Sequence, residues 1–295
     1  YRPLGGPVGE EWSLWRVDDY LAKHFRFLSR SAWQKRIKNG EVRLNGGQVK
    51  VSQRIRLGDT LHYYHPQGRE PAVTAKLPVV WQSQQTMVIA KPPGMPMHEN
   101  GPYRFNTVAH QLIQQYGAGW AAVHRLDRET SGLVLCANTH QARESLHRQF
   151  ETKTIAKTYL AVVKGEPTWD RETVEAPIDD LVGSEIRIKK WVVPGGQSAL
   201  THFTKVAGCG DHTWVLARPV TGRTNQIRIH AAWLGYPLLG DKLYHPSERV
   251  FLEYYDRGMT DWVRQQAGFD RVCLHAWRVA FCDPESSNLV EVTAP

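Results

Sequence analysis

Two short segments hold the side chains that could do chemistry. In residues 124–132 (HRLDRETSG), five ionisable side chains, Asp127 among them, occupy six consecutive positions between two apolar runs. In residues 218–228 (RPVTGRTNQIR), Arg223 and Arg228 lie five positions apart. A carboxylate held near arginines can attack a substrate or assist the loss of a leaving group. Each segment alone could equally be a turn that ends a strand, since Gly, Asp and Ser favour turns.

Other kinds of active site lack their usual signatures. The sequence has no G-x-S-x-G, no G-x-x-x-x-G-K-[ST], no G-x-G-x-x-G and no H-E-x-x-H. The thirteen histidines are scattered, and His202, His212 and His275 lie in predicted strands, where a hydrogen-bonded, partly buried histidine is common. Because no spacing builds a coordination sphere, we expect no metal site.

The bulk composition limits the class of protein. The chain has 295 residues, of which 41% are hydrophobic, enough for one large domain or two unequal ones with packed cores. The four cysteines are far apart and form no C-x-x-C pair, which fits a reducing compartment. No apolar run approaches the roughly 18 residues of a membrane span, and the first twenty residues lack a signal-peptide pattern. We therefore expect a cytoplasmic protein without a membrane partner.

The excess positive charge is concentrated in the first quarter of the chain. Of the net charge of +8, residues 1–78 carry +7. Such a segment favours a polyanionic partner, because neutralising phosphates supplies most sequence-independent affinity for nucleic acid. The alternative is a solvated basic face, and a membrane surface fits less well because no single long amphipathic helix carries the charge. Residues 23–56 contain one acid, Glu41, and ten basic residues: Lys23, Arg26, Arg30, Lys35, Arg36, Lys38, Arg43, Lys50, Arg54 and Arg56.

The basic segment has its own predicted elements. Apolar residues at steps of three and four predict a helix over residues 14–28. Ser29 or Ser31 could cap a second helix that ends at Gly40. Residues 41–51 (EVRLN-GG-QVKV) predict a hairpin, and residues 59–64 predict a further strand. Residues 65–78, with proline and glycine and no periodicity, are interpreted as a linker.

The elements that must position the two reactive segments lie beyond this linker. Two strands are expected within residues 79–94, joined by a polar turn. The absence of a regular strand–helix–strand repeat favours an α+β fold with a mixed, largely antiparallel sheet. The predicted domains are 1–64, a small α/β unit, and 79–295. Within the second domain, helices are expected at 107–117 and 139–151, and strands at 157–165, 212–220 and 271–281.

Two resemblances to known families follow from these motifs. Residues 30–45, with the pattern R-S-x-W-Q-K-R-I-K-N-G-x-V-R-L-N, resemble the αL-type RNA-binding domain named after ribosomal protein S-four. The HRLDxxTSG and GRTxQIR segments, with AKPPGMPMH before them and KTYLAVVKGE between them, resemble the RluA-type pseudouridine synthases, which isomerise uridines of ribosomal or transfer RNA. The second resemblance covers residues 79–295, and the αL-type domain is a common companion in that family.

The RluA-type resemblance implies an enzyme that needs no cofactor and no metal. It assigns Asp127 as the catalytic aspartate and Tyr159 as the tyrosine that stacks on the target base. It assigns Arg228 as the partner of the aspartate and Arg125 as the side chain that fills the gap left by the flipped uridine. Asn225 stands where the family usually has histidine, and asparagine can still form hydrogen bonds there.

The chemistry accounts for these residue types. Moving uracil from a nitrogen–carbon to a carbon–carbon glycosidic bond oxidises nothing, so a positioned, ionised carboxylate suffices, and a neighbouring arginine favours its charged form. Unstacking the target costs a few kcal/mol, which aromatic stacking and a guanidinium can offset. We therefore interpret the segment around Asp127 as a catalytic loop between two strands.

The sequence-based hypothesis is a monomeric RNA pseudouridine synthase acting on structured RNA. Ribosomal RNA is favoured by the basic N-terminal domain, whereas residues 97–112 resemble family members that act on transfer RNA. The alternatives are a non-catalytic, ribosome-associated RNA-binding factor and a hydrolase that uses Asp127 with a histidine. The residues expected to bind RNA are Arg125, Arg223, Asn225, Arg30, Lys35, Arg36 and Lys38.

Overall fold

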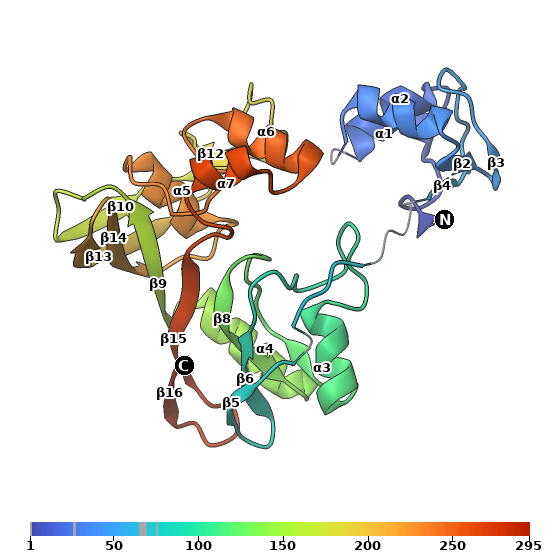
Figure 1. Cartoon of the computed structure of the whole chain (residues 1–295). Coiled ribbons are helices and arrows are strands. Elements are labelled where there is room, and N and C mark those ends of the chain that lie inside the picture. Colours follow the sequence, from blue (N-terminus) through green and yellow to red (C-terminus); the bar gives the residue numbers. More distant parts are fainter. Residues whose placement is uncertain (1, 26–27, 65–69, 75) are drawn as a thin grey trace. The chain divides into compact units, whose positions relative to one another are not determined.

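The computed structural model describes residues 2–25, 28–64, 70–74 and 76–295. The chain forms two compact units, Tyr1–Arg69 and Glu70–Pro295, called here the N-terminal and C-terminal units, and each is described by itself (Figure 1). The basic residue Arg26 and part of the predicted linker, residues 65–69 and 75, lie outside the described residues. Within the described part of the chain, no helix is both long and apolar enough to cross a membrane.

The N-terminal unit packs two helices against a small antiparallel sheet with the strand order β1-β4-β2-β3. Its hairpin, predicted over residues 41–51, is confirmed by the pairing of Leu44 with Gly47. Ser29 caps the second helix by accepting a hydrogen bond from the Ala32 N–H at 3.1 Å, as one of the two predicted serines. The elements are β1 (Arg2–Pro3), a 3-10 turn (Glu10–Trp12), α1 (Val17–His24), α2 (Arg30–Lys38), β2 (Val42–Leu44), β3 (Gly47–Gln48) and β4 (Leu61–Tyr63).

The first predicted helix was placed too early. Helix α1 begins at Val17, while Leu14 has a φ of 66° and its side chain is 61% exposed. The reason is that the N–H of Leu14 is hydrogen-bonded to the carbonyl of Ile55, a pairing that a continuous helix would break. Leu14 therefore lies on a bend that leads into the helix rather than on its apolar face.

A buried carboxylate joins the two helices of the N-terminal unit. Asp18 on α1 accepts hydrogen bonds from Arg16, Gln34 and Arg30 at 2.7–3.3 Å. Burial alone would raise the pKa of Asp18, but these donors outweigh it and hold the pKa at about 2. The local position of α1 against α2 is thus fixed by a charged hydrogen-bond cluster as well as by apolar packing.

Residues 70–74 and 76–78 of the predicted linker pack onto the C-terminal unit. The carboxylate of Glu70 accepts the backbone N–H groups of Arg104, Phe105 and Asn106 at 2.7, 3.2 and 2.6 Å. Leu77 is fully buried, and its backbone carbonyl accepts a hydrogen bond from the hydroxyl of Tyr116. These residues are therefore part of the folded C-terminal unit.

The C-terminal unit is built on a sheet with the strand order β10-β13-β14-β9-β15-β8-β6-β5, in which β16 also pairs with β15 and β7 with β8. Every neighbouring pair is antiparallel except β8 and β15. The expected α+β fold with a mixed, largely antiparallel sheet is thus confirmed. The strands are β5 (Val79–Gln82), β6 (Thr86–Lys91), β7 (Ala121–Ala122), β8 (Ser131–Ala137), β9 (Ala156–Lys164), β10 (Arg171–Glu175), β11 (Ile178–Asp180), β12 (Lys190–Val192), β13 (Leu200–Cys209), β14 (His212–Pro219), β15 (Leu274–Cys282) and β16 (Leu289–Thr293).

Two helices cover opposite faces of the sheet at β6 and β8, and α3 (Val108–Tyr116) and α4 (His140–Glu151) match the predicted helices. Successive strand residues point to opposite faces. Accordingly, Val134 of β8 packs in the cluster with α3, whereas Leu133 and Leu135 pack in the cluster with α4. Strand β8 is therefore buried along its whole length, which explains its uninterrupted apolar sequence.

The other half of the sheet carries the remaining helices. Helix α5 (Gln226–Trp233) packs Ile227 and Ala231 against the core of β9, β13 and β14, and its opposite side packs Ile229 near the small β11–β12 sheet. Helices α6 (Glu248–Arg257) and α7 (Asp261–Ala267) precede β15. The two halves of the sheet meet where β8 lies beside β15.

A pair of truncations should show where the C-terminal unit begins. A chain that starts at Glu70 should keep the unfolding free energy of the C-terminal unit, because the Glu70 contacts and the Leu77 side chain remain. A chain that starts at Val79 should be less stable by about 3–5 kcal/mol, since a buried leucine and several hydrogen bonds are lost. Urea unfolding of both chains measures the difference. Equal stabilities would show that residues 70–78 contribute nothing to this core.

Candidate active site

The loop between β7 and β8 lies at the seam where the two halves of the sheet meet. Strand β8 begins at Ser131 and pairs parallel with β15 through Ser131↔His275 and Gly132↔Ala276. Gly132 has a φ of 111°, and a Cβ at this position would collide with the carbonyl oxygen of Ala276. Glycine is required here because no other residue allows β15 to approach so closely. The predicted placement of this loop between two strands is confirmed.

The centre of the site is an arginine held between two aspartates. Arg228 on α5 donates from Nε and Nη2 to both oxygens of Asp241 at 2.7 and 2.9 Å. Its Nη1 donates to Oδ2 of Asp127 at 3.0 Å. The Asp241 carboxylate is fully buried, whereas the Asp127 carboxylate is partly exposed to solvent. Asp241 therefore fixes the guanidinium, and the guanidinium in turn orients Asp127.

Burial and charge act in opposite directions on this pair. Burial would lower the pKa of Arg228, but Asp241 and Asp127 raise it well above its ordinary value. Burial likewise would raise the pKa of Asp241, and Arg228 outweighs it, so that pKa is lowered. Arg228 and Asp241 thus form a permanently charged support. Oδ1 of Asp127 has no hydrogen-bond partner within residues 2–25, 28–64, 70–74 and 76–295, which leaves it available to a substrate.

Asn225 belongs to the same cluster through its side-chain hydrogen bonds. Asn225 occupies the N-cap position of α5, yet its side chain caps no backbone N–H. Instead Asn225 has a left-handed φ of 58°, its Oδ1 accepts from Nη1 of Arg228 at 2.9 Å, and its Nδ2 donates to the hydroxyl of Tyr244 at 3.1 Å. Asparagine tolerates this backbone conformation better than most residues.

Two tyrosines border the carboxylate and remain protonated. Burial raises the pKa of Tyr159 above its usual range, and the negative charge of Asp127 raises it further. Burial also raises the pKa of Tyr244, to about 12. Both phenols are therefore neutral, so each offers an aromatic face and a hydroxyl rather than a negative charge.

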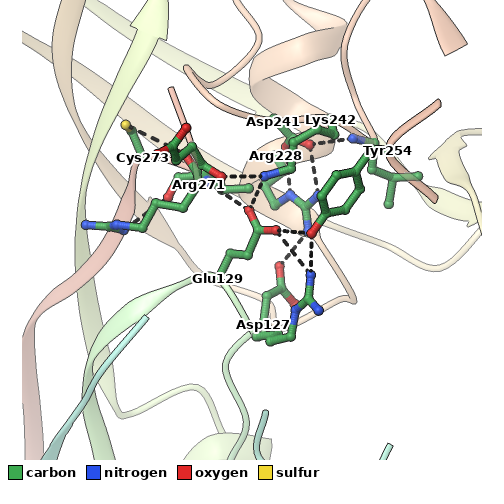
Figure 2. A network of polar contacts seen from close by, with 12 residues as sticks. Asp127, Glu129, Arg228, Asp241, Lys242, Tyr254, Arg271 and Cys273 are labelled. Carbon is green, nitrogen blue, oxygen red and sulfur yellow. Dashed lines mark hydrogen bonds and ion pairs between the residues drawn. The ribbon is translucent and has the colours of Figure 1, made fainter. Parts of the chain in front are cut away.

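Two further buried cations hold the residues that follow Asp127 in the loop. Nζ of Lys242 donates to Oε2 of Glu129 at 2.6 Å, and the same oxygen accepts the N–H of Val272 at 3.0 Å (Figure 2). Nζ of Lys91 donates to the carbonyl of Arg128 at 3.0 Å. Three successive loop residues are thus each held by a different buried cation. Arg228 of α5 holds residue 127, Lys91 of β6 holds residue 128, and Lys242, in the turn after α5, holds residue 129. Sequence analysis identified only the first of these contacts.

Lys91 is almost fully buried, and two more backbone carbonyls, of Pro92 and Met95, accept from it at 3.0 and 2.8 Å. Burial lowers its pKa to about 7, and the charge of Asp127 opposes that shift. Three carbonyl acceptors match the three N–H bonds of an ammonium group. The lysine therefore ties the Pro-Pro-Gly turn to the reactive loop.

A pocket of about 470 Å³ opens beside Asp127. Every C-terminal residue that the sequence singled out lines it: Arg125, Asp127, Tyr159, Arg223, Asn225 and Arg228. Arg223 is exposed, and its Nε donates to the carbonyl of Ser198 at 3.0 Å, so it is not the partner of Asp127. Lys153 and Lys157 also line the pocket and were not identified from the sequence. No motif contains Lys153, and Lys157, although it begins the KTYLAVVKGE segment, was given no role.

The N-terminal candidates differ in their surroundings. Arg30 forms ion pairs with Asp18 and Asp19 at 2.9 and 2.8 Å. Lys35 and Lys38 are exposed on α2, and no carboxylate within the described residues forms an ion pair with them. Lys38 also borders a second hollow, of about 380 Å³.

Arg36 pairs with Glu41, the one acid of the basic segment, at 2.8 Å. The charge available to a partner on this unit is therefore smaller than the sequence count suggested. In the described part of the chain, no group of three or more His, Cys, Asp or Glu side chains is arranged to hold a metal ion.

Two family models match the chain. Residues 85–233 match the model described as RNA pseudouridylate synthase, and residues 15–61 match the S4 domain. The S4 match covers most of the N-terminal unit, and the other match contains both reactive segments.

Relatives and solved structures resemble the chain over most of its length. The RNA pseudouridine synthase YlyB of Bacillus subtilis is 32% identical and covers 98% of this chain and 92% of its own. Ribosomal large subunit pseudouridine synthase C of Vibrio cholerae is 30% identical and covers 98% and 91%. The mitochondrial tRNA pseudouridine(32) synthase of Saccharomyces cerevisiae is 32% identical and covers 81% and 52%. The structure of human RNA Pseudouridylate Synthase Domain Containing 1 has the same fold, with a TM-score of 0.59, 24% identity and coverage of 77% and 86%.

The Arg228–Asp241 pair should behave as one energetic unit. Either Arg228→Met or Asp241→Leu alone should lower the unfolding free energy by about 3–5 kcal/mol, because the remaining charge is buried without its partner. The double variant should lose much less than the sum of the two. Urea unfolding of all four proteins completes this cycle. Additive losses would mean that the two side chains are not coupled.

A half-buried histidine should make the C-terminal unit sensitive to acid. Burial lowers the pKa of His124 to about 3, and its Nε2 accepts the Leu135 N–H at 3.0 Å. The unfolded chain binds this proton below about pH 6.5 and the folded chain only near pH 3, so stability falls as the pH drops through that window.

In the His124→Gln variant, the slope of unfolding free energy against pH between 7 and 5 should be smaller, by up to about 1.4 kcal/mol per pH unit. The exposed His147→Gln on α4 is the matched control. Parallel slopes for His124→Gln and the parent protein would contradict the assignment of a neutral His124.

Proposed function

We propose that this chain, which belongs to the RNA pseudouridylate synthase family and carries an S4 domain, isomerises uridine in ribosomal RNA with Asp127 as its catalytic carboxylate. Membership of the family makes the protein an isomerase that acts on RNA. The assignment of Asp127 rests on the hydrogen-bonded series Asp127–Arg228–Asp241 at the wall of an open pocket.

The reaction conserves every atom of the nucleotide. The bond between N1 of uracil and C1′ of the ribose breaks, the base turns, and C5 forms a bond to C1′. C5 loses a proton and N1 gains one, so the substrate is neither oxidised nor reduced. A carboxylate with a free oxygen can attack the nucleotide or assist the departure of the base, and the free Oδ1 of Asp127 meets that requirement.

The neighbouring residues orient the carboxylate and bind the RNA. Arg228 holds Oδ2 at 3.0 Å and so aims Oδ1 toward the pocket. Tyr159, as a neutral aromatic ring on the pocket wall, suits stacking on a flipped uracil. Arg125 is exposed at the pocket and can fill the space that the uridine leaves in the RNA. Flipping a base costs a few kcal/mol, which these contacts would offset.

Ribosomal RNA is favoured over transfer RNA as the substrate. The Vibrio cholerae relative, whose name specifies the ribosomal large subunit, is similar over 98% of this chain, so the similarity includes the S4 domain. The similarity to the yeast tRNA enzyme covers 81% of this chain and about half of that enzyme. Exposed Lys35 and Lys38 on the S4 domain suit a second contact with a large, structured RNA. A non-catalytic ribosome-associated factor would need this domain but not the Asp127 cluster.

Replacing Asp127 with asparagine should separate chemistry from binding. The Asp127→Asn variant keeps the shape of the side chain and its hydrogen bond to Arg228 but loses the ionised carboxylate. Tritium release from C5-labelled large-subunit ribosomal RNA should fall below about 1% of the parent rate, the scale of loss when a covalent catalyst is removed. RNA affinity in a filter-binding assay should stay within a few fold.

Transfer RNA labelled in the same way provides the comparison between substrates. Release from transfer RNA alone by the parent protein would overturn the proposed substrate but not the role of Asp127. An Asp127→Asn variant with undiminished release would overturn the catalytic assignment. A parent protein inactive on both RNAs would favour the non-catalytic factor.

A further inference from the structure

The positive charge of the pocket exceeds what the target base requires. Five cationic side chains line it, against the carboxylates of Asp127 and Glu151. Arg228 is already committed to two aspartates. Uracil is neutral, so the remaining cations are not needed for the base itself. The anionic groups of an RNA strand are its phosphates, and one lies on each side of every nucleotide.

Two of these cations, Lys153 and Lys157, come from the turn after α4 and from the start of β9. Lys153 is the second residue after α4, and Lys157 is the second residue of β9. No carboxylate within the described residues forms an ion pair with either lysine. The Lys157 ammonium lies over the ring of Phe150, whose centre is 5.7 Å away, and its charge also acts on His124.

Lys153 occupies a backbone position that glycine would fill more easily. Its φ is 59°, its N–H bonds to the carbonyl of Phe150 at 3.2 Å, and the N–H of Thr154 bonds to the carbonyl of Gln149 at 3.0 Å. This is the Schellman arrangement that ends a helix, in which the left-handed residue is usually glycine. A positive charge near a helix C-terminus is favourable, but that effect requires neither a strained lysine nor a second lysine on the strand.

Lys157 is half-buried, and burial lowers its pKa. A desolvated ammonium without a counter-ion destabilises the folded protein. Unpaired charge of this kind is typical of sites that bind an oppositely charged ligand. Both lysines therefore lower the stability of the free protein. Lys153 does so through its left-handed backbone conformation and Lys157 through the desolvation of its ammonium group.

We propose that Lys153 and Lys157 bind the RNA phosphates that flank the target uridine, on the α4–β9 side of the pocket. This inference rests on the proposed function and assigns a binding role to two residues to which the family resemblance gave none. The phosphate contacts would position the strand so that the target base enters beside Asp127. The lysines are positioning residues, so the chemical step itself should not depend on them.

The test uses the full chain with in vitro transcribed large-subunit ribosomal RNA as the probe. In Lys157→Met and Lys153→Gly, the dissociation constant from filter binding should rise about tenfold, the loss expected when a charge-assisted hydrogen bond is removed. The slope of log affinity against log salt should become shallower by about 0.7–0.9 for each variant. The single-turnover rate at saturating RNA should be unchanged.

Stability gives an independent readout. Neither substitution should lower the Tm of the free protein, because one removes a desolvated charge and the other relieves a strained backbone. Lys205→Met is the matched control, since Lys205 is already paired with Glu166 at 3.1 Å, and it should leave RNA affinity unchanged. Glu151→Gln, which removes an acid from the pocket, should tighten binding.

An unchanged dissociation constant and salt slope in both lysine variants would overturn the proposal. So would a lower Tm in both variants, which would show that the lysines support the fold. A slower single-turnover rate at saturating RNA, with unaltered affinity, would show that the lysines act in the chemical step. That result would also overturn the proposal. These outcomes can be distinguished from a failure of the proposed function. The proposed function fails if the parent protein releases no tritium from the RNA.

Discussion

A buried guanidinium is the constraint on which the site depends. Arg228 cannot remain charged inside the C-terminal unit without compensation, and Asp241 supplies it through two hydrogen bonds. Because that fork is fixed, the position of the remaining nitrogen of Arg228, Nη1, is fixed as well, and it donates to Asp127 and to Asn225. The carboxylate of Asp127, the proposed catalytic group, is therefore oriented by an ion pair that no substrate needs to contact.

The loop that carries Asp127 is held in the same manner at each successive residue. Arg228 holds the carboxylate of Asp127, Lys91 holds the carbonyl of Arg128, and Lys242 holds the carboxylate of Glu129. The three cations come from different segments, and the loop lies at the seam between the two halves of the sheet. A loop of irregular backbone thereby gains the rigidity that an active site requires, since precise placement of the reacting group contributes much of its rate.

The basic side chains at the site fall into two groups that differ in their surroundings. Those behind the loop are buried and hydrogen-bonded to carboxylates or to backbone carbonyls, so they stabilise the geometry. Those on the pocket wall, such as Lys157, lack a carboxylate partner within the described part of the chain, so their charge is available to a ligand. The same distinction divides the S4 domain, where Arg30 is paired with Asp18 while Lys35 is exposed. Net charge counted along the sequence does not separate the two groups.

The sequence by itself determined the fold class, most elements and the two reactive segments, because periodicity and turn chemistry are local properties. It assigned Asp127 and Arg228 by resemblance, but the geometry joining residues 101 positions apart exists only in the folded sheet. Asp241 and Lys91 were missed for the same reason. Their roles come from burial and from partners distant in sequence, and the start of α1 was misplaced because the pairing of Leu14 with Ile55 overrides its helical spacing. Tertiary structure alone decided which charges are paired and which remain available.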